Sequence, residues 1–477
     1  MIFNSIDFGI FFPIVFFLYW LFFKKNILSR NIFLIIVSYT FYGWWDWRFL
    51  SLIVISSLAD YIIGGKIFKE QEHKKRKKWL WLSIGINIGF LAFFKYYGFF
   101  VDSFIAAFSI FGLKLNSFSL NIILPVGISF YTFQTLSYTI DIFYKKIEPT
   151  KNMFAFFAFV SFFPQLVAGP IERAKDLLPQ FLKTNHINYE LLRSGLLLMA
   201  WGFLKKIVIA DRLAVFVDGA YGDIDNLDGI TSIVAIIFFA FQLYLDFSAY
   251  SDIAIGSART LGINLSTNFR RPYLSQTFSD FWKRWHISLS SWFKDYVYIP
   301  LGGNRVSEKL LIRNIIIVFA LSGLWHGASW NFVIWGVLNG LFILIFDRFL
   351  TNKNKNVFKR ILIALFIFTL WALSLIFFRA QTFANAIVMI SNIFESSKDV
   401  LYNYGLNSLE FSFTIKLLII YVIFEILIEK YENLYQWFIN RFFIIRWLVY
   451  ILLIVAIVLF GSYGVGLNDN NFIYFQF

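Results

Sequence analysis

An almost uninterrupted apolar stretch, FGIFFPIVFFLYWLFF at residues 8–23, decides the fold class of this sequence. Such a stretch suits a helix that crosses a bilayer, which needs about 20 mainly apolar residues. It has neither the basic leader nor the small-residue cleavage site of a secretory signal, so we expect it to be retained as a span. Lys24, Lys25 and Arg30 follow it, and basic residues stay on the cytoplasmic side of a membrane. The sequence thus predicts a first span that starts outside the cell and ends in the cytoplasm.

The composition of the whole chain agrees with a membrane protein. Of the 477 residues, 59% are hydrophobic and 15% are charged, whereas soluble proteins carry about 25% charged residues. In a membrane protein, an excess of Lys and Arg such as the net charge of +14 sets the orientation of the chain in the bilayer. The lipid bilayer is therefore the expected partner, and nucleic acid is not. The lack of cysteine excludes disulfides, thiol nucleophiles and cysteine-based metal sites. Only four histidines are available for imidazole chemistry.

The other apolar stretches predict an all-α, polytopic integral membrane protein with about ten to twelve transmembrane helices. The further spans are expected at 31–42, 50–63, 79–101, 120–143, 191–210, 230–255, 315–335, 332–346, 361–378, 411–428 and 447–460. The first two are short, and we expect them to form a hairpin. The stretch 381–410 is expected to be an external loop with room for a helix of its own.

Two further segments are expected not to cross the bilayer. The stretch 154–168 is apolar, but basic residues flank it on both sides and Pro164 lies near its end, which favours a re-entrant or interfacial segment. Large apolar residues recur every three or four positions in 278–299, namely at Trp282, Trp285, Leu289, Trp292 and Phe293. This spacing favours a helix that lies among the lipid headgroups.

The distribution of charge predicts which side of the membrane each loop faces. The basic cluster 66–78 and the mainly basic region 259–313 are expected in the cytoplasm, and the acidic loop 218–228 is expected outside. The tail 461–477 is also expected outside, as the extracytoplasmic end of a single membrane domain over 1–477. No internal repeat is visible, so the inverted repeats of many transporters are not indicated.

His326 is the first candidate for chemistry. It lies in an apolar stretch interrupted by small residues, and a histidine at membrane depth is a functional candidate because its burial is costly. Gly323 and Gly327 allow a backbone or a ligand to approach it closely. A dry pocket would keep the imidazole neutral and able to accept a proton as a general base. A structural histidine that bonds a neighbouring helix fits the residue type equally well.

His286 is the second candidate, in a segment where basic residues stand beside aromatic ones. The functional interpretation is a cytoplasmic site for a phosphate-bearing donor, with positive charge from Lys283, Arg284, Lys294 and Arg305. The alternative is a membrane anchor formed by an interfacial helix. The other two histidines are weaker candidates, since His73 belongs to a charge run and His186 to a polar connector.

Other polar side chains fall inside the predicted spans and could line a tunnel. Gln134, Tyr138 and Asp141 are four and three residues apart, so they share one helix face. Further candidates for the lining are Asp246, Trp325, Ser329 and Asn331. Bonding between helices is the commoner role for any single polar residue in a span. The sequence has no His-Glu-x-x-His, P-loop or Gly-x-Ser-x-Gly motif, and neither a metal nor a bound cofactor is expected.

Four segments resemble one family, the membrane-bound O-acyltransferases, and within it the bacterial alginate and peptidoglycan O-acetyltransferase type. They are SFFPQLVAGPI at 161–171, the run 280–305 that ends in YIPLGGNR, the stretch 323–335 around Trp-His-Gly, and FIYFQF at 472–477. The second and third segments are highly specific. Together with the length and the number of spans, they extend the resemblance over essentially the whole chain.

The resemblance implies transfer of an acyl group across the membrane through a tunnel. The invariant histidine of the family is matched by His326, and a second conserved polar position by His286. The implied donor is cytoplasmic acetyl-CoA, or an acyl group on a carrier protein, and the implied acceptor is an extracytoplasmic hydroxyl for O-acetylation of a cell-envelope polysaccharide. The implied location is the cytoplasmic (inner) membrane of a bacterium.

The resemblance also implies a role for Tyr474. Similar terminal motifs are proposed to accept the acyl group as a tyrosine ester and to pass it to a secreted, periplasmic acetyltransferase partner. The alternative for this terminal motif is an aromatic anchor at the membrane interface.

Two other functions stay compatible with the sequence. One is a transporter or flippase for a lipid-linked sugar, which the composition alone favours equally; the specific motif around His326 and the lack of visible repeats favour the enzyme. The other keeps the enzyme class but transfers D-alanine from a carrier protein to teichoic acid.

Overall fold

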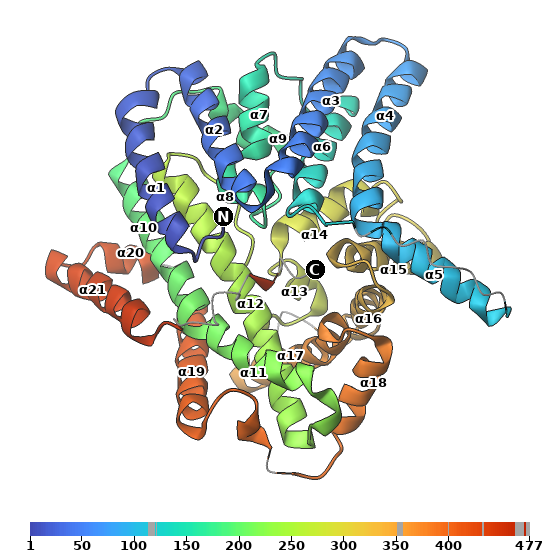
Figure 1. Ribbon diagram of the computed structural model, residues 1–477, viewed down its shortest axis with the longest axis vertical. Helices are drawn as coiled ribbons and strands as arrows, with labels where there is room; N and C mark the ends of the chain where they lie inside the picture. Colours follow the sequence, from blue (N-terminus) through green and yellow to red (C-terminus); the bar gives the residue numbers. More distant parts are fainter. Residues whose placement is uncertain are drawn as a thin grey trace. The chain divides into compact units, whose positions relative to one another are not determined.

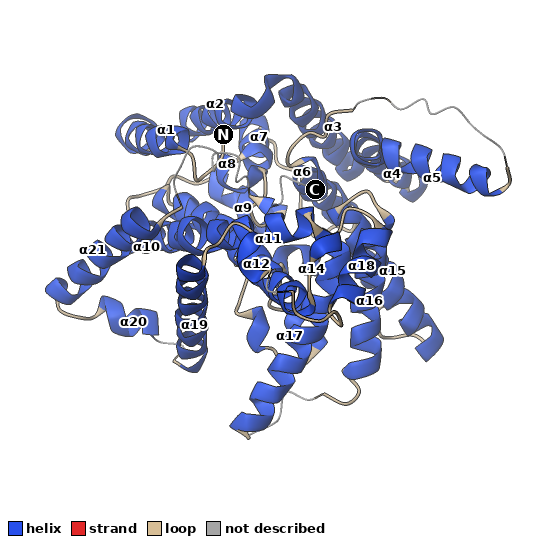
Figure 2. Cartoon of the chain, turned by 60° about the horizontal axis from the view of Figure 1, so that its bottom comes forward, coloured by secondary structure: helices blue, strands red, loops and turns tan. Residues whose placement is uncertain are grey.

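The computed structural model describes residues 1–112, 120, 122–350, 356–398, 400–431, 434–462 and 472–473. Within these ranges every regular element is a helix, and no strand occurs (Figure 2). The prediction of an all-α protein is confirmed. Eight stretches are long and apolar enough to cross a membrane: Ile6–Phe23, Ile27–Lys69, His73–Ile110, Gly229–Thr260, Glu308–His326, Val357–Arg379, Ser408–Lys430 and Phe443–Phe460. The protein is therefore a multi-pass membrane protein.

The chain divides into two compact units, each assembled from separate stretches of sequence. The first unit consists of Met1–Leu196, Ala254–Ser266 and Gly327–Ser329. The second consists of Leu197–Ile253, Thr267–His326 and Trp330–Phe477. Two helices, α10 (Tyr189–Phe203) and α12 (Gly229–Thr260), have residues in both units.

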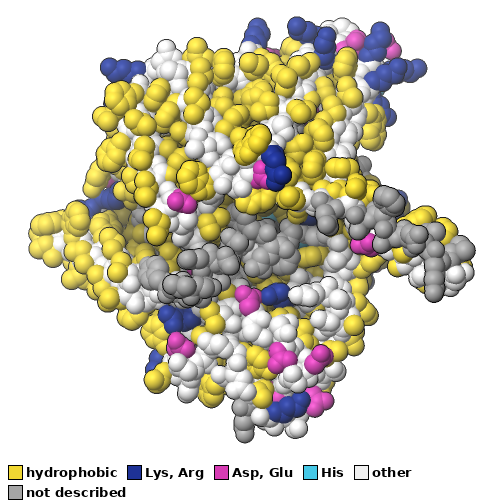
Figure 3. Space-filling model, in the orientation of Figure 1, with side chains coloured by type: hydrophobic (Ala, Val, Ile, Leu, Met, Phe, Trp, Pro, Cys, Tyr) yellow, Lys and Arg dark blue, Asp and Glu magenta, His cyan; other side chains and the backbone are white. Residues whose placement is uncertain are grey.

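The first unit holds most of the N-terminal helices. They are α1 (Ile6–Leu18), α2 (Ile27–Asp46), α3 (Leu50–Lys69), α4 (His73–Leu91), α5 (Tyr97–Ile110), α6 (Ile128–Phe143), α7 (Met153–Ser161), α8 (Phe163–Leu166) and α9 (Ala174–Phe181), with the short segments η1 (Tyr19–Phe23), η2 (Trp47–Phe49) and η3 (Ala92–Tyr96). Lys and Arg side chains gather over the connection between α3 and α4, which is the basic cluster expected in the cytoplasm (Figure 3).

Three helices of the first unit, α3, α4 and α6, pack together through buried polar side chains (Figure 1). Asp60 on α3 accepts hydrogen bonds from Ser83 Oγ at 2.6 Å and from Asn87 Nδ2 at 2.7 Å, both on α4. On α6, Thr135 Oγ1 donates to Asn87 Oδ1 at 3.1 Å, and Thr139 Oγ1 lies 2.9 Å from Ser83 Oγ. Polar bonds of this kind hold helices together where apolar burial gives no preference between helix and lipid.

The second unit holds the remaining helices. They are α11 (Asp211–Gly222), α13 (Phe278–Trp282), α14 (Ile287–Phe293), α15 (Glu308–His326), α16 (Trp330–Phe346), α17 (Val357–Arg379), α18 (Phe383–Asn392), α19 (Ser408–Lys430), α20 (Leu434–Ile439) and α21 (Phe443–Phe460), with η4 (Leu204–Ala210), η5 (Ile224–Asn226), η6 (Pro272–Leu274), η7 (Lys294–Tyr298) and η8 (Leu401–Asn403).

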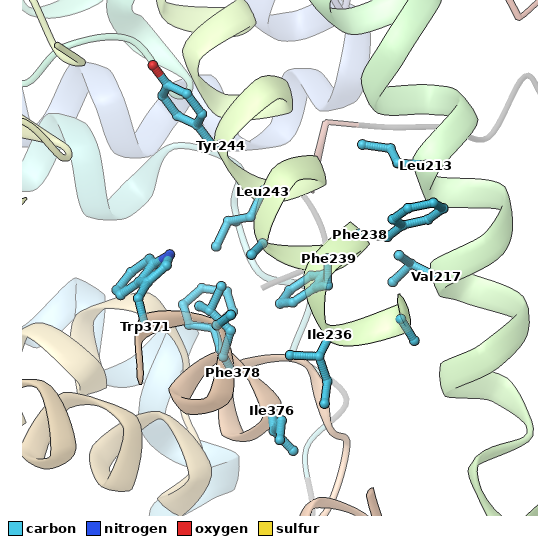
Figure 4. Packing of buried hydrophobic residues seen from close by; sticks show 14 of the residues in the cluster. Leu213, Val217, Ile236, Phe238, Phe239, Leu243, Tyr244, Trp371, Ile376 and Phe378 are labelled. Carbon is cyan, nitrogen blue, oxygen red and sulfur yellow. The ribbon is translucent and has the colours of Figure 1, made fainter. Parts of the chain in front are cut away.

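The core of the second unit includes the facing sides of α12 and α17 (Figure 4). Phe239 and Leu243 on α12 point toward Trp371 and Phe378 on α17, and all four side chains are buried. The rings of Phe239 and Phe378 lie 6.4 Å apart between centroids. This packing fixes the C-terminal end of α17, where Phe378 lies beside His326.

Several predicted segments differ in length from the observed helices. α2 and α3 have 20 residues each, so the hairpin predicted at 31–63 is built from full-length helices and not from short ones. Of the span predicted at 120–143, the described residues are helical from Ile128, because Gly127 has φ +75° and a Cβ there would lie 2.8 Å from the carbonyl oxygen of Leu166.

The segment 154–168 forms α7 and α8, of 9 and 4 residues, which are too short to cross a bilayer and so agree with the prediction. The predicted loop at 381–410 contains α18.

Candidate active site

His326 is the last residue of α15, which packs closely against α16. The contact is backbone to backbone: a Cβ on Gly323 would lie 2.1 Å from the carbonyl oxygen of Phe332, and one on Gly336 would lie 2.2 Å from that of Phe319. Only glycine permits such an approach. The sequence therefore places His326 at the end of a rigid helix pair, one turn beyond Gly323.

His286 lies between α13 and α14 and breaks the helix that its aromatic spacing predicted. Its backbone has φ +43°, in the left-handed region that few residues other than glycine adopt. The five large apolar residues that carry this spacing are all buried in the second unit: Trp282, Trp285, Leu289, Trp292 and Phe293. The prediction of one interfacial helix was wrong, because the same spacing serves two short helices that pack in the protein core.

The structure brings the two histidines together inside the second unit. The ring centroids of His286 and His326 lie 6.3 Å apart, and the two residues are 0% and 3% exposed. The ring of Trp325 lies 5.8 Å from that of His286 and 5.0 Å from that of His326. The ring centroids of Trp335 and Phe378 lie 5.1 and 5.5 Å from that of His326. Two imidazoles forty residues apart in sequence thus share one aromatic enclosure.

Asn268 determines which nitrogen of His286 carries the proton. The backbone N–H of Ser288 can only donate, and it points at the Asn268 side-chain oxygen at 3.2 Å, so this atom is the acceptor end of the amide. The Ser288 hydroxyl donates to the same oxygen at 2.8 Å, and the Asn268 Nδ2 donates to Ser251 Oγ at 3.1 Å. His286 Nδ1 lies 3.2 Å from that oxygen and must therefore be the N–H, which leaves the lone pair on Nε2.

Burial keeps His286 uncharged. It lowers the pKa of the imidazole from 6.5 to about 3, because the charged form loses its hydration. At neutral pH the ring is a neutral imidazole with a defined tautomer. The lone pair on Nε2 can accept a hydrogen bond, but a ring with this pKa is a weak base, so the role of general base falls to His326 in preference to His286.

The predicted donor-binding cations differ in their surroundings. Lys283, Lys294 and Arg305 are exposed. Arg284 is partly buried and bound to two carboxylates, with Nη1 at 2.8 Å from Glu429 Oε1 and Nε at 3.1 Å from Asp280 Oδ2. Arg284 is therefore paired with acidic groups of its own unit, whereas the side chains of the other three cations are exposed.

The predicted tunnel-lining residues divide between the two units. Gln134, Tyr138, Asp141 and Ser329 belong to the first unit, and Asp246, Trp325 and Asn331 to the second.

In the first unit, Gln134 Nε2 donates to the Phe159 carbonyl at 2.8 Å, and the Tyr138 hydroxyl accepts from the Thr150 N–H at 3.2 Å. In the second, Asn331 Nδ2 donates to the Ala380 carbonyl at 3.0 Å. These hydrogen bonds join separate segments of the chain, which is the structural role considered for such residues. Their role in lining a tunnel stays a prediction.

Two residues, Asn268 and Lys206, have buried polar contacts in the structure but were not predicted as site residues from the sequence. Asn268 gave no signal, since nothing around it in sequence marks it as a partner of His286. Lys206 did give a signal in the sequence. It lies within the span predicted at 191–210, and a charged residue at membrane depth is a functional candidate for the same reason as His326. Tyr474 lies outside the described residues. Within those residues, no three His, Asp or Glu side chains gather as metal ligands do.

Comparisons with known proteins add a family match and three relatives. The profile of the membrane-bound O-acyltransferase family matches residues 118–385. The chain is 39% identical over 396 residues to a probable alginate O-acetylase AlgI of Pseudomonas putida, covering 83% of this chain and 80% of that protein. It is 36% identical over 399 residues to a peptidoglycan O-acetyltransferase of Helicobacter pylori, covering 78% and 75%. A teichoic acid D-alanyltransferase of Bacillus subtilis is 28% identical over 251 residues, or 50% of this chain and 62% of that protein.

Proposed function

The chain belongs to the membrane-bound O-acyltransferase family and is an acyltransferase, and from this premise we propose that it O-acetylates a cell-envelope polysaccharide. The acetyl group comes from acetyl-CoA on the cytoplasmic side and reaches a hydroxyl on the outer side of the bacterial inner membrane. The polymer is peptidoglycan or an exopolysaccharide such as alginate. The similarity to two O-acetyltransferases over about three quarters or more of the chain supports this group over D-alanine, for which the matched part is half of the chain.

The observation that carries the proposal is the buried pair of His286 and His326. In the proposed reaction, His326 accepts the proton of the acceptor hydroxyl while the hydroxyl oxygen bonds to the acetyl carbonyl carbon. The carbon–sulfur bond of the thioester then breaks, and the sulfur leaves with the bonding electrons and takes up a proton. His286, itself a neutral imidazole, lies beside His326 with 6.3 Å between the ring centroids.

The exposed cations Lys283, Lys294 and Arg305 are proposed to attract the phosphates of acetyl-CoA. The donor could equally be an acyl group on a carrier protein, whose phosphopantetheine linker carries a phosphate. The two sources differ in a simple test, because only acetyl-CoA supports transfer by the purified protein alone.

We further propose that Tyr474 receives the acetyl group as an ester and that a periplasmic acetyltransferase partner takes it from there to the polymer. Tyr474→Phe removes the hydroxyl and keeps the ring. We expect this variant to lose polymer acetylation in cells, while undiminished acetylation would leave the residue only an anchoring role.

The central test measures release of the CoA thiol from acetyl-CoA by the purified protein with a hydroxyl acceptor. His326→Ala should lower the rate by about 100-fold or more, since general-base catalysis contributes that much. His186→Ala is the matched control, because His186 is an exposed connector residue, and it should react at the wild-type rate. Wild-type transfer by His326→Ala would refute the assignment. Flux of a lipid-linked sugar without loss of acetyl would indicate a transporter instead.

A further inference from the structure

Three charged side chains of the second unit form a buried cluster around Lys206. Lys206 Nζ lies 2.6 Å from Asp246 Oδ1 and 2.8 Å from Asp211 Oδ1. Lys206 belongs to η4, Asp211 begins α11 and Asp246 lies on α12, so the cluster ties three elements together. The three residues are 2%, 5% and 2% exposed. With one cation and two carboxylates, the cluster has room for a further hydrogen-bond donor.

The C-terminal segment supplies that donor. The backbone N–H of Ile473 donates to Asp246 Oδ2 at 2.6 Å, so Asp246 uses one oxygen for Lys206 and the other for the segment. The ring of Phe472 lies 4.4 Å from Lys206 Nζ, a cation–π contact, and 4.8 Å from the ring of Tyr250. Phe472 and Ile473 are 1% and 2% exposed, and Ile473 packs into the hydrophobic core of the unit.

We propose that Lys206, Asp211, Asp246 and Tyr250 form a docking site for the C-terminal segment of this chain, with Asp246 as the group that holds it. Each part of the site recognises one feature of the segment: a carboxylate takes the backbone N–H, the ammonium takes the aromatic ring, and the core takes the aliphatic side chain. Because a charge-assisted hydrogen bond in a buried place is strong, removal of the carboxylate releases the segment.

The docking itself does not depend on the reaction proposed above. The role of the docking site in catalysis, by contrast, rests on that proposed reaction. If Tyr474 is the acyl acceptor, the site holds Ile473, the residue immediately before it, and consecutive Cα atoms are only about 3.8 Å apart. Asp246 then acts as a positioning residue for the acceptor and not as a lining of the tunnel.

The chain has no cysteine, so a single thiol reports on docking without background. Ile473→Cys in the full-length, detergent-solubilised protein should react slowly with a maleimide, because position 473 is buried. Adding Asp246→Ala should speed the labelling by at least about tenfold, the factor expected when one charge-assisted hydrogen bond is lost. Asp218→Asn, which alters an exposed ion pair with Arg379, is the matched control and should leave the labelling slow.

A second variant separates release from unfolding. Phe472→Ala changes only the segment and leaves the buried charges intact, so the protein should stay a single species on gel filtration while Ile473→Cys becomes reactive. The reference for full exposure is a thiol at Ser396, which is exposed. If Ile473→Cys alone labels as fast as Ser396→Cys, or if neither Asp246→Ala nor Phe472→Ala changes its rate, the docking site is refuted. Since labelling needs no acetyl donor, this result is independent of the proposed reaction.

Discussion

At the scale of single residues, one amide decides which nitrogen of His286 carries the proton and which can accept a hydrogen bond. Asn268 is itself fixed by a backbone N–H that can only donate and by its bond to Ser251, so its oxygen cannot turn away from the imidazole. The left-handed backbone of His286 then directs the ring into the aromatic enclosure. Strained backbone of this kind persists where the surrounding structure holds it, and it often marks functional sites.

Asn268→Leu should allow the His286 ring to populate both neutral tautomers. Leucine keeps the approximate size of asparagine but offers no acceptor, so the Nδ1–H form loses its partner. In protein labelled with ¹⁵N-histidine, which has only four such residues, the His286 signals should change from one fixed tautomer to a mixture. Acetyl transfer should fall by about 10- to 100-fold, as when other residues that orient a functional imidazole are lost.

Asn268→Asp is the control for this experiment, because it keeps the acceptor oxygen. It should preserve the Nδ1–H form, and a His286→Gln spectrum identifies the signals. An unchanged His286 tautomer in Asn268→Leu would show that another group fixes the ring.

The low pKa of His286 makes stability depend on pH. Below the ordinary histidine pKa of 6.5 the unfolded chain binds a proton that the folded state, with a pKa of about 3, does not bind. The free energy of unfolding therefore decreases as the pH falls below 6.5 and stops decreasing near 3. Between pH 7.5 and 5.5 this amounts to about 1.4 kcal/mol. Thermal unfolding in detergent at the two pH values should show a smaller drop for His286→Gln than for the wild type. Equal drops would contradict the low pKa.

The residues of the site differ in how well the sequence revealed them. His326 and His286 stood out because imidazoles are rare here and costly to bury. Asn268 did not, since a hydrogen bond across 18 residues leaves no pattern in the sequence.

At the scale of elements, the pair α15 and α16 depends on glycines at its crossing. Gly323→Ala should push the two helices apart, because a methyl group cannot lie 2.1 Å from a carbonyl oxygen. We expect a loss of about 1–3 kcal/mol in stability, typical of overpacking, and reduced acetyl transfer because His326 moves with α15. The measurement is the midpoint of thermal unfolding together with the transfer rate.

Gly85→Ala on α4 serves for comparison, since no atom lies within 4 Å of the added carbon. It should leave both quantities near the wild-type values. An unchanged unfolding midpoint in Gly323→Ala would mean that the helices do not meet as closely as described.

Helix positions followed from hydropathy, but helix breaks did not. Apolar residues that recur every three or four positions indicate which side chains share a helix face. They do not indicate whether that face packs against lipid or against protein. This is why 278–299 was expected at the membrane surface, although Trp282, Trp285 and Trp292 are buried around a break at His286. The break itself depends on the fit of Asn268 to the turn.

At the scale of the whole molecule, charge predicts the topology. The connection between α3 and α4 is expected in the cytoplasm and the loop around α18 outside. Gln71→Cys and Ser396→Cys place single thiols at these two exposed positions. In intact cells a membrane-impermeant maleimide should label Ser396→Cys at once, and Gln71→Cys only after the membrane is permeabilised. The reverse pattern would invert the topology and with it the proposed direction of transfer.

The membrane character of the molecule was readable from its composition, because the exclusion of charge from hydrocarbon acts on every span alike. The division into two units was not, since compactness depends on contacts between residues that are distant in sequence. The same holds for the docking of Ile473 on Asp246, which no local pattern indicates.

The bond between Asp246 and Ile473 joins residues 227 positions apart, and this has a consequence for biosynthesis. At about 5–20 residues per second, a ribosome needs roughly ten to forty-five seconds to proceed from one to the other. During that time α12 enters the membrane with a carboxylate whose final partner has not been made. Until residues 472 and 473 are made, Lys206 is the partner that this carboxylate has, so a product cut short before residue 472 would lack the Ile473 hydrogen bond and would be a better substrate for quality-control proteases.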